Sequence, residues 1–487
     1  MLKIAILADL HLTDNPRSVK LKVLDWALDE ARRRNAGLLA GIGDLTATGS
    51  AVQSELLSGR IAACGIPFCA TPGNAECRES PAGALRQNIP APAGVPLFLA
   101  DSAADRLDAE TLRRLGNLPE NGGFLLATHC PPSMWPEDQR AVLNAAVARR
   151  AVTEVIAGHV HADGPGTLRG LDPDKAAGGP PALSVFSRHA NGDWSREDCA
   201  MPGVDPADWT EAARAAFRRV LGVSCMYDPF GVLAEAAELG IAVAELRYGT
   251  TGSGNADILA ALERWRNRGG RILSMHLPSL TAKDESQAVL EKAVRNAVEL
   301  GCDRVTLHVP EVRAGEYPAL KTRLAGDCSR LLVPLLEHGI RVGIENLHTI
   351  NGKCAPEERV FGCTIPECAD WLAALRERTG SEEIGFHLDI GHARNNAPFS
   401  QTMNVSDYYN APGLPINGLH FHQVRQQPDG TFRNHGPLEG FYDKLIALGG
   451  YFLAREGGLL NADAPVILEI QQPGGGIASY RKLTACL

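Results

Sequence analysis

Short hydrophobic runs that each end in a polar residue recur through the first part of the chain and predict a series of buried strands. They are the runs at 3–8, 38–42, 66–70, 124–128 and 154–157. Between the first two runs, Leu21, Leu24, Leu28 and Ala31 fall on one face of a helix. Alternating strands and helices predict an α/β fold for this part of the chain.

The residues that follow these strands are of metal-ligand type. The stretches are Asp9-Leu10-His11, Gly43-Asp44, Gly73-Asn74, His129 and Gly158-His159-Val160-His161. Side chains two positions apart on a strand point the same way, and α/β sheets bind ligands beyond the carboxyl ends of their strands. The candidate metal ligands are therefore Asp9, His11, Asp44, Asn74, His129, His159 and His161. Mixed oxygen and nitrogen donors suit Mn, Fe or Zn, and we expect Asp44 to bridge two ions.

In order and spacing these stretches resemble the calcineurin-like metallophosphoesterases, whose motifs are D-x-H, G-D, G-N-H-[DE], H and G-H-x-H. The resemblance covers about residues 1–200 and implies a four-layer αββα fold that hydrolyses phosphate mono- or diesters with two ions. One position departs from it, because Ala75 stands where the family has a histidine near the leaving group. Either the leaving group needs little protonation, or another residue such as His189 supplies the proton, or the domain binds metal and turns over slowly.

The stretch 192–209 is rich in Asp, Pro and Gly and predicts a domain boundary near residue 205. We assign residues 1–205 to the first domain, 206–218 to a linker and 219–487 to the second domain. Residues 210–220 within this region have a helical pattern.

From about residue 219 the pattern alternates strand and helix eight times, which predicts a (β/α)₈ TIM barrel. The expected strands are 222–226, 241–246, 271–276, 304–308, 341–345, 384–390, 418–422 and 466–470. Ionisable residues load their C-terminal ends, where such barrels carry their chemistry. Buried carboxylates at these positions cost several kcal/mol unless they are paired or bind metal.

This half resembles the xylose-isomerase-like barrels (AP endonuclease family 2), which include sugar isomerases, sugar epimerases and endonuclease-four-type nucleases. The matching stretches are Met275-His276, Leu307-His308, Ile344-Glu345-Asn346, Leu388-Asp389-Ile390-Gly391-His392, Phe421-His422 and Leu468-Glu469-Ile470. The epimerase-type members imply one divalent ion on Glu345, Asp389, His422 and Glu469. In them the two glutamates also move a proton between adjacent carbons of the substrate. His420 is the alternative to His422, which we prefer.

His276, His308, His392, His420 and His435 are then candidates for substrate binding or for further metal ions in the barrel. The nuclease-type members hold three zinc ions and use a D-x-H pair for the third. Here Arg433-Asn434 precede His435, so that pair is missing.

The formal charge of −9 and the absence of a basic run argue against a nucleic-acid partner. The 12 cysteines form no paired framework, and no hydrophobic run reaches membrane-spanning length. We therefore expect a cytoplasmic enzyme with a small phosphorylated or sugar-like substrate and no membrane partner; the oligomeric state stays open.

The expected function is bifunctional: phosphoester hydrolysis by the first domain and isomerase- or epimerase-like chemistry on a sugar or polyol by the second. One alternative is a nucleic-acid-processing phosphodiesterase with an endonuclease-four-like barrel. The other is a first domain that binds metal without hydrolysis and serves the barrel.

Overall fold

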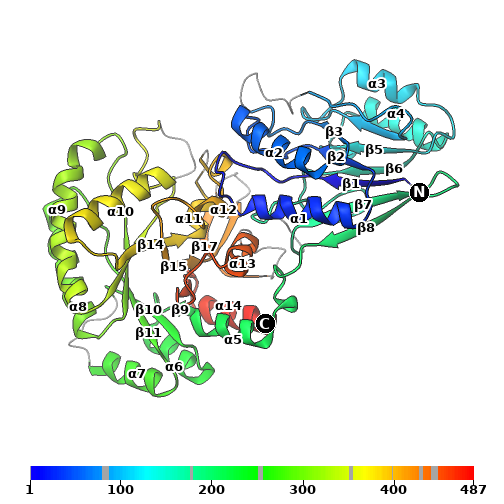
Figure 1. Cartoon of the computed structure of the whole chain (residues 1–487). Helices are drawn as coiled ribbons and strands as arrows, with labels where there is room; N and C mark the ends of the chain where they lie inside the picture. The colour runs from blue at the N-terminus through cyan, green and yellow to red at the C-terminus, as the bar shows by residue number, and fades with distance from the viewer. Residues whose placement is uncertain are drawn as a thin grey trace. The chain divides into compact units, whose positions relative to one another are not determined.

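The structure is a computed structural model that describes residues 2–78, 87–175, 179–249, 256–349, 355–396, 399–426, 432–439 and 448–487. The chain forms two units (Figure 1). Unit 1 comprises Met1–Asp205 and Leu448–Leu453, and unit 2 comprises Pro206–Ala447 and Ala454–Leu487.

The segment 206–218, which the sequence assigned to a linker, is structured and belongs to unit 2. It holds the short helix η3 (Pro206–Asp208) and most of helix α5 (Glu211–Val220). Thr210 caps α5 by accepting a hydrogen bond from the backbone N–H of Ala213, and Phe217 is buried. The segment expected to be a linker thus carries a helix that is capped at its start and has a buried side.

Unit 1 contains two sheets (Figure 1). The five-stranded sheet has the order β3-β2-β1-β7-β8. Its strands are β1 (Lys3–Leu7), β2 (Leu38–Ile42), β3 (Phe68–Thr71), β7 (Ala182–Arg188) and β8 (Trp194–Ala200). The three-stranded parallel sheet β4-β5-β6 is formed by Leu97–Ala100, Phe124–Thr128 and Val152–Ala157. β1, β2 and β3 are parallel, whereas β7 runs antiparallel to β1.

The two sheets of unit 1 face each other across one hydrophobic core. Ile4 and Ile6 of β1 share this core with Leu125 and Ala127 of β5. The helices cover the outer faces: α1 (Lys20–Arg33) and α2 (Ala51–Cys64) on the larger sheet, and α3 (Ala109–Gly116) and α4 (Glu137–Ala148) around Trp135 on the smaller. Unit 1 therefore has four layers, helix–sheet–sheet–helix.

Unit 2 is built on a closed barrel of eight parallel strands, which confirms the barrel predicted from the sequence. The strands are β9 (Leu221–Ser224), β10 (Val243–Arg247), β11 (Ile272–His276), β12 (Arg304–His308), β13 (Arg341–Glu345), β14 (Ile384–Asp389), β15 (Ile416–Phe421) and β18 (Val466–Leu468). In register, His308 lies beside Glu345 and Asp389 beside His420. The register thus gathers the ionisable strand ends at one rim of the barrel.

Helices surround the barrel strands (Figure 1). They are α6 (Pro229–Leu239), α7 (Ala256–Asn267), α8 (Asp284–Glu299), α9 (Tyr317–Glu337), α10 (Ile365–Thr379), α11 (Ile390–Arg394), η4 (Phe399–Gln401), α12 (Val405–Tyr408) and α14 (Gly475–Ala485). Helix α13 (Leu448–Glu456) begins with the stretch Leu448–Leu453 of unit 1 and ends in unit 2. After β15 the chain forms a hairpin of β16 (Gln423–Gln426) and β17 (Phe432–Gly436), in which Gln423 pairs with Gly436. This hairpin, which the sequence pattern did not predict, brings His435 back to the end of β15.

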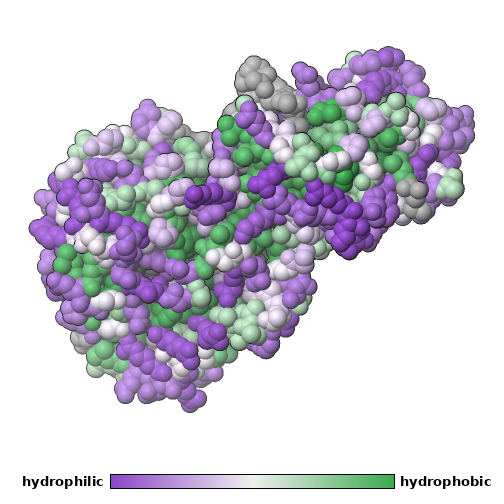
Figure 2. Space-filling view, in the orientation of Figure 1, coloured by the Kyte–Doolittle hydropathy of each residue, from purple (hydrophilic) through white to green (hydrophobic). Residues whose placement is uncertain are grey.

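Hydrophilic residues are spread over the face of both units visible in Figure 2, with small hydrophobic areas between them. Val52 and Tyr227 are among the large hydrophobic side chains that are exposed. Within the described ranges, no helix has both the length and the hydropathy that crossing a membrane requires.

Candidate metal centres

All seven ligand candidates of unit 1 come together. Asp9 and His11 follow β1, Asp44 follows β2, and Asn74 follows β3. His129 follows β5, and His159 and His161 follow β6. Parallel pairing aligns the ends of the strands within each sheet, and the shared core aligns the two sheets.

The seven residues form two sets that meet at Asp44. One carboxylate oxygen of Asp44 lies 3.5 Å from Nε2 of His11, and the other lies 3.4 Å from Nε2 of His129. On the first side Asp9, His11 and His161 hold ligand atoms within 4.8 Å of one another. On the second side the Asn74 side-chain oxygen is 2.9 Å from His129 Nε2 and 3.1 Å from His159 Nδ1. Asp44 thus has the geometry of a bridging ligand.

The backbone at this site is strained. The φ angles of Asp9, His11, Asp44, His159 and His161 lie between 49° and 71°, in the left-handed region that non-glycine residues rarely adopt. Such strain persists only where the surrounding structure imposes it, and it concentrates at functional sites. Gly158 allows the close approach, since a side-chain carbon there would contact the Asp9 carboxylate.

Two histidines of the first set, His11 and His161, face each other through Nε2, and each leaves its other ring nitrogen without a hydrogen-bond partner. Nε2 of His11 lies 3.4 Å from Nε2 of His161, and Nδ1 of each ring is buried with no hydrogen-bond partner. Burial, and next the positive charge of Lys175, lowers the pKa of His161 to about 3 and that of His11 well below its usual value. Two neutral imidazoles that aim lone pairs at one point, beside the carboxylate of Asp9, suit a divalent cation.

In the second set, the buried histidine His129 has a raised pKa. Burial alone would lower the pKa of His129, but the hydrogen bond and charge of Asp44 outweigh it and raise this pKa to about 9. Nδ1 of His129 donates to the carbonyl oxygen of Ile42, which leaves Nε2 facing Asp44 and Asn74. A ring held by one nitrogen and aimed by the other is typical of histidine ligands.

The structure corrects the expectation for His189. This residue is exposed in the turn after β7, and Ser187 just before it pairs with Lys3 at the start of β1. Because β7 is antiparallel to β1, His189 lies at the opposite edge of the sheet from Asp9. Ala75 is buried, and its backbone N–H donates to the Asp44 carboxylate at 2.7 Å.

Glu76 is a residue that the sequence analysis did not assign to the site. Its carboxylate accepts hydrogen bonds from the backbone N–H groups of Asp44, Thr46 and Gly73, and it is buried. It therefore fixes the two loops that carry Asp44 and Asn74.

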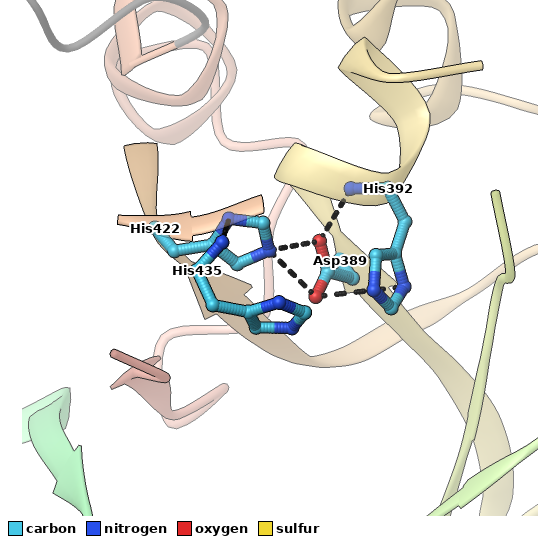
Figure 3. A group of neighbouring side chains, drawn as sticks. All are labelled: Asp389, His392, His422 and His435. Carbon is cyan, nitrogen blue, oxygen red and sulfur yellow. Dashed lines mark hydrogen bonds and ion pairs between the residues drawn. The ribbon is translucent and has the colours of Figure 1, made fainter. Parts of the chain in front are cut away.

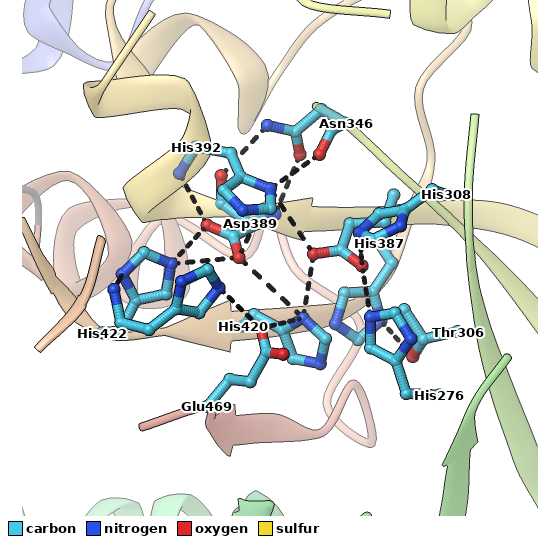
Figure 4. A network of polar contacts seen from close by, with 12 residues as sticks. His276, Thr306, His308, Asn346, His387, Asp389, His392, His420, His422 and Glu469 are labelled. Atoms are coloured by element: carbon cyan, nitrogen blue, oxygen red, sulfur yellow. Dashed lines mark hydrogen bonds and ion pairs between the residues drawn. The ribbon is translucent and has the colours of Figure 1, made fainter. Parts of the chain in front are cut away.

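The barrel rim carries a first group of three candidates, His276, His308 and Glu345. Figure 4 labels the two histidines of this group. Nε2 of each histidine lies 3.2 Å from Glu345 Oε2, and neither contact has hydrogen-bond geometry. Nδ1 of His276 donates to the Leu277 carbonyl at 3.0 Å, and Nδ1 of His308 lies 3.0 Å from Ser279 Oγ. The Nε2 atoms are thus both left to face the carboxylate.

A second group surrounds His420 (Figure 4). Its Nδ1 lies 3.0 Å from Glu345 Oε1, 3.3 Å from Glu469 Oε2 and 3.9 Å from Asp389 Oδ2. His420, rather than the preferred His422, therefore stands among the three predicted carboxylate ligands. Glu345 belongs to both groups, with Oε2 toward the first and Oε1 toward the second.

The remaining candidates, Asp389, His392, His422 and His435, form a third group (Figure 3). Nε2 of His422 is 2.9 and 3.1 Å from the two oxygens of Asp389, and its Nδ1 accepts the backbone N–H of His435 at 2.9 Å. Because Nδ1 accepts, the proton of neutral His422 sits on Nε2 and is donated to Asp389. Gly391 leaves room for this ring, since a side-chain carbon there would overlap it.

Other members of the third group keep a nitrogen for the site. Nδ1 of His392 donates to the Asn346 carbonyl at 2.9 Å, and His435 Nε2 lies 3.2 Å from Glu469 Oε2. His435 takes a φ of 57°, the same strained region as the ligands of unit 1.

Burial and the neighbouring carboxylates shift the pKa values of three histidines at the barrel rim. Burial alone would lower the pKa of His276, but its close contact with the Glu345 carboxylate raises the pKa to about 9. The pKa of His420 is likewise raised, because Glu245 and Glu345 outweigh burial. Burial lowers the pKa of His308 to about 4. The buried carboxylates therefore act in opposite directions to burial on the pKa values of His276 and His420.

Three buried polar residues beside these groups were not assigned to the site from the sequence: Glu245, Asn346 and His387. Asn346 accepts the backbone N–H of Asp389 at 2.9 Å and donates to its carbonyl at 3.1 Å, which fixes the end of β14. Their positions in the sequence could have indicated two of them: Glu245 lies near the end of a strand, and Asn346 directly follows Glu345.

A family model described as xylose isomerase-like TIM barrel matches residues 233–454. Among solved structures, a D-tagatose 3-epimerase-like protein is 18% identical and covers 55% of this chain and 96% of its own, with a TM-score of 0.42. Endonuclease IV from Thermus thermophilus is 20% identical, with coverages of 55% and 98% and a TM-score of 0.37.

A dimetal phosphatase from Danio rerio is 13% identical and covers 40% of this chain and 98% of its own, with a TM-score of 0.32. No curated protein matches the chain. At such identities and TM-scores, none of the solved structures decides a substrate or a reaction. The segment 233–454, which matches the xylose isomerase-like model, contains most strands of the closed parallel barrel of unit 2.

Proposed function

We propose that this chain is a metal-dependent enzyme with two centres, of which unit 1 hydrolyses phosphate esters. The observation that carries this proposal is the position of Asp44 between two sets of neutral or hydrogen-bonded ligand atoms. Two divalent ions, when bound, polarise a phosphoryl group and supply a hydroxide nucleophile. Mn, Fe and Zn all suit this donor set.

The residues of unit 1 define what the site would do with a substrate. Asp9, His11, Asp44 and His161 would hold one ion, and Asp44, Asn74, His129 and His159 the other. Ala75 offers no proton to a leaving group, and His189 is too distant to do so. The proposed substrates are therefore esters whose leaving group departs as a stable anion.

Asp44→Asn tests this centre. A neutral amide cannot bridge two cations, so we expect loss of bound metal and of phosphoesterase activity on an aryl phosphate panel. Asp108→Asn is the matched control, because Asp108 caps α3 and lies outside the cluster. Unchanged activity and metal content in Asp44→Asn would overturn the assignment.

For the barrel we propose metal-dependent chemistry on a small sugar- or polyol-like substrate. The supporting observation is the convergence of Glu345, Asp389, His420 and Glu469 at one rim. In isomerase- or epimerase-type chemistry, Glu345 and Glu469 would transfer a proton between adjacent carbons of the substrate.

A second candidate reaction for the barrel is phosphoester hydrolysis. It is favoured by Glu345, whose two oxygens face different groups of ligands. A carboxylate that bridges two cations keeps no basic oxygen for abstracting a proton from carbon, and two cations suit hydrolysis.

One experiment separates the two reactions of the barrel. The metal-loaded chain carrying Asp44→Asn, which silences unit 1, is incubated in D₂O with a panel of sugars and sugar phosphates. Deuterium at a substrate carbon supports proton transfer by Glu345 and Glu469, whereas release of inorganic phosphate supports hydrolysis. Neither outcome with any substrate, in a chain that binds metal in the barrel, would contradict both reactions.

A further inference from the structure

Glu245 is a buried carboxylate at the barrel rim for which the proposed reactions have no use. It lies on β10, near the candidate ligands, and none of its surface is exposed. A carboxylate in such a place costs several kcal/mol unless other groups compensate it. The compensation therefore shows what this residue does.

Three groups donate to Glu245. Oε1 accepts a hydrogen bond from His420 Nε2 at 2.9 Å. Oε2 accepts from the hydroxyls of Ser274 at 2.9 Å and Thr306 at 3.0 Å. Ser274 lies on β11, the neighbour of β10, and Thr306 on β12, the next strand along, so the barrel wall fixes the carboxylate in one orientation.

The contact with Glu245 determines which nitrogen of His420 faces the site. With Nε2–H donated to Glu245, only Nδ1 is left to face Glu345, Glu469 and Asp389. His276 and His308 differ in this respect, since their rings are held by an uncharged carbonyl and an uncharged hydroxyl. A charged partner holds an imidazole more firmly and makes its other nitrogen a better electron donor.

Glu245 is itself unsuited to be a ligand. His420 separates it from the other carboxylates, because the two ring nitrogens of one imidazole point to opposite sides. Both carboxylate oxygens are also taken, one by His420 and the other by hydroxyls of the barrel wall.

We propose that Glu245 is a positioning residue that fixes the tautomer and the orientation of His420 and thereby strengthens ion binding at its Nδ1. The proposal rests on the ion site proposed for the barrel. Ser274 and Thr306 extend the same chain of contacts, since their hydroxyls hold the carboxylate that holds the histidine.

The test is Glu245→Gln in the full-length chain, with Zn²⁺ affinity measured by competition against a chromogenic chelator. Gln can still accept from His420 and contact both hydroxyls, so the fold is retained while the charge is lost. We expect the barrel ion to bind about 10- to 100-fold more weakly. Unit 1 in the same sample serves as an internal reference and keeps its affinity.

Three further measurements make the outcome decisive. Thr306→Val removes one hydroxyl that holds Glu245, and we expect a smaller loss in the same direction. Asp407→Asn changes a buried carboxylate that accepts the backbone N–H of Asn404, and we expect no loss of affinity. In Co²⁺-loaded protein, the visible absorption of the barrel site should change in Glu245→Gln and Thr306→Val and not in Asp407→Asn.

The results separate this proposal from the one on which it rests. If Glu345→Gln leaves the Zn²⁺ content of the chain unchanged, the barrel ion site itself is wrong. If Glu345→Gln removes the ion while Glu245→Gln and Thr306→Val bind Zn²⁺ as tightly as the wild type, only the positioning role is overturned.

Discussion

Removing His276 should change the pH dependence of stability of the metal-free barrel. His276 is 7% exposed, its Nε2 faces Glu345 at 3.2 Å and its Nδ1 donates to the Leu277 carbonyl. In the folded chain the charged form of His276 can donate from both ring nitrogens. Burial alone would lower the pKa of His276, but the Glu345 carboxylate stabilises this charged form and raises the pKa to about 9. In His276→Gln this titrating group is absent.

The sign follows from the raised pKa. The unfolded chain binds the proton with the ordinary pKa of 6.5, so the folded state binds it more tightly. The extra stability is fully present below pH 6.5 and is lost as the pH rises through 9. At about 1.4 kcal/mol per pH unit, the loss amounts to about 3 kcal/mol.

The assay is urea unfolding of the metal-free chain between about pH 6 and pH 10, followed by tryptophan fluorescence. The barrel transition is the one that the substitution shifts. The wild type minus His276→Gln difference in unfolding free energy should decrease by about 3 kcal/mol over this range. A difference that stays constant or increases with pH would refute the ion pair between His276 and Glu345.

Three further predictions concern single side chains. Ala75→His should increase the turnover of alkyl phosphates by about 10²-fold, because their leaving group needs a proton. The turnover of nitrophenyl phosphates should stay nearly unchanged. An equal effect on both substrates would contradict this prediction. Lys175→Gln should raise KM for phosphate esters about 5-fold more than it lowers kcat, because the positive charge of Lys175, which acts on His11 and His161, would also attract an anionic substrate to them. Steady-state kinetics in which only kcat fell would contradict this prediction. His422→Gln should keep the ion content of the barrel, because Nε2 of His422 donates to Asp389 and its Nδ1 accepts from His435. His420→Gln should lose an ion. Metal analysis in which His422→Gln loses the ion and His420→Gln keeps it would make His422 the ligand.

The convergence of the seven residues in unit 1 could be predicted from local sequence because parallel strands align their carboxyl ends. Asp9, Asp44 and Asn74 each follow a short hydrophobic run, and the sheet order does the rest. The same reasoning predicted the eight barrel strands. These local patterns do not reveal long-range antiparallel pairing between strands. The position of His189, beside the start of β1 and away from Asp9, could therefore not be inferred.

The choice between His420 and His422 shows a second limit. Residues two apart share a face only while the strand continues, and β15 ends at Phe421. His422 lies between β15 and the hairpin of β16 and β17, where its ring meets the backbone of His435 instead of the glutamates. Hydrophobic alternation does not locate the last residue of a strand, and a nearby hairpin leaves little signal of its own.

The central claim, that the chain holds two separate divalent-metal centres, is tested most directly by metal analysis of the full-length protein. Four proteins are purified with Mn²⁺ or Zn²⁺: the wild type, Asp44→Asn, Glu345→Gln and the double variant. Their metal content is then measured by inductively coupled plasma mass spectrometry. Asp44 should account for about two ions and Glu345 for at least one, so each single variant should lose the ions of its own centre and the double variant nearly all. An ion content that neither substitution changes would contradict the claim.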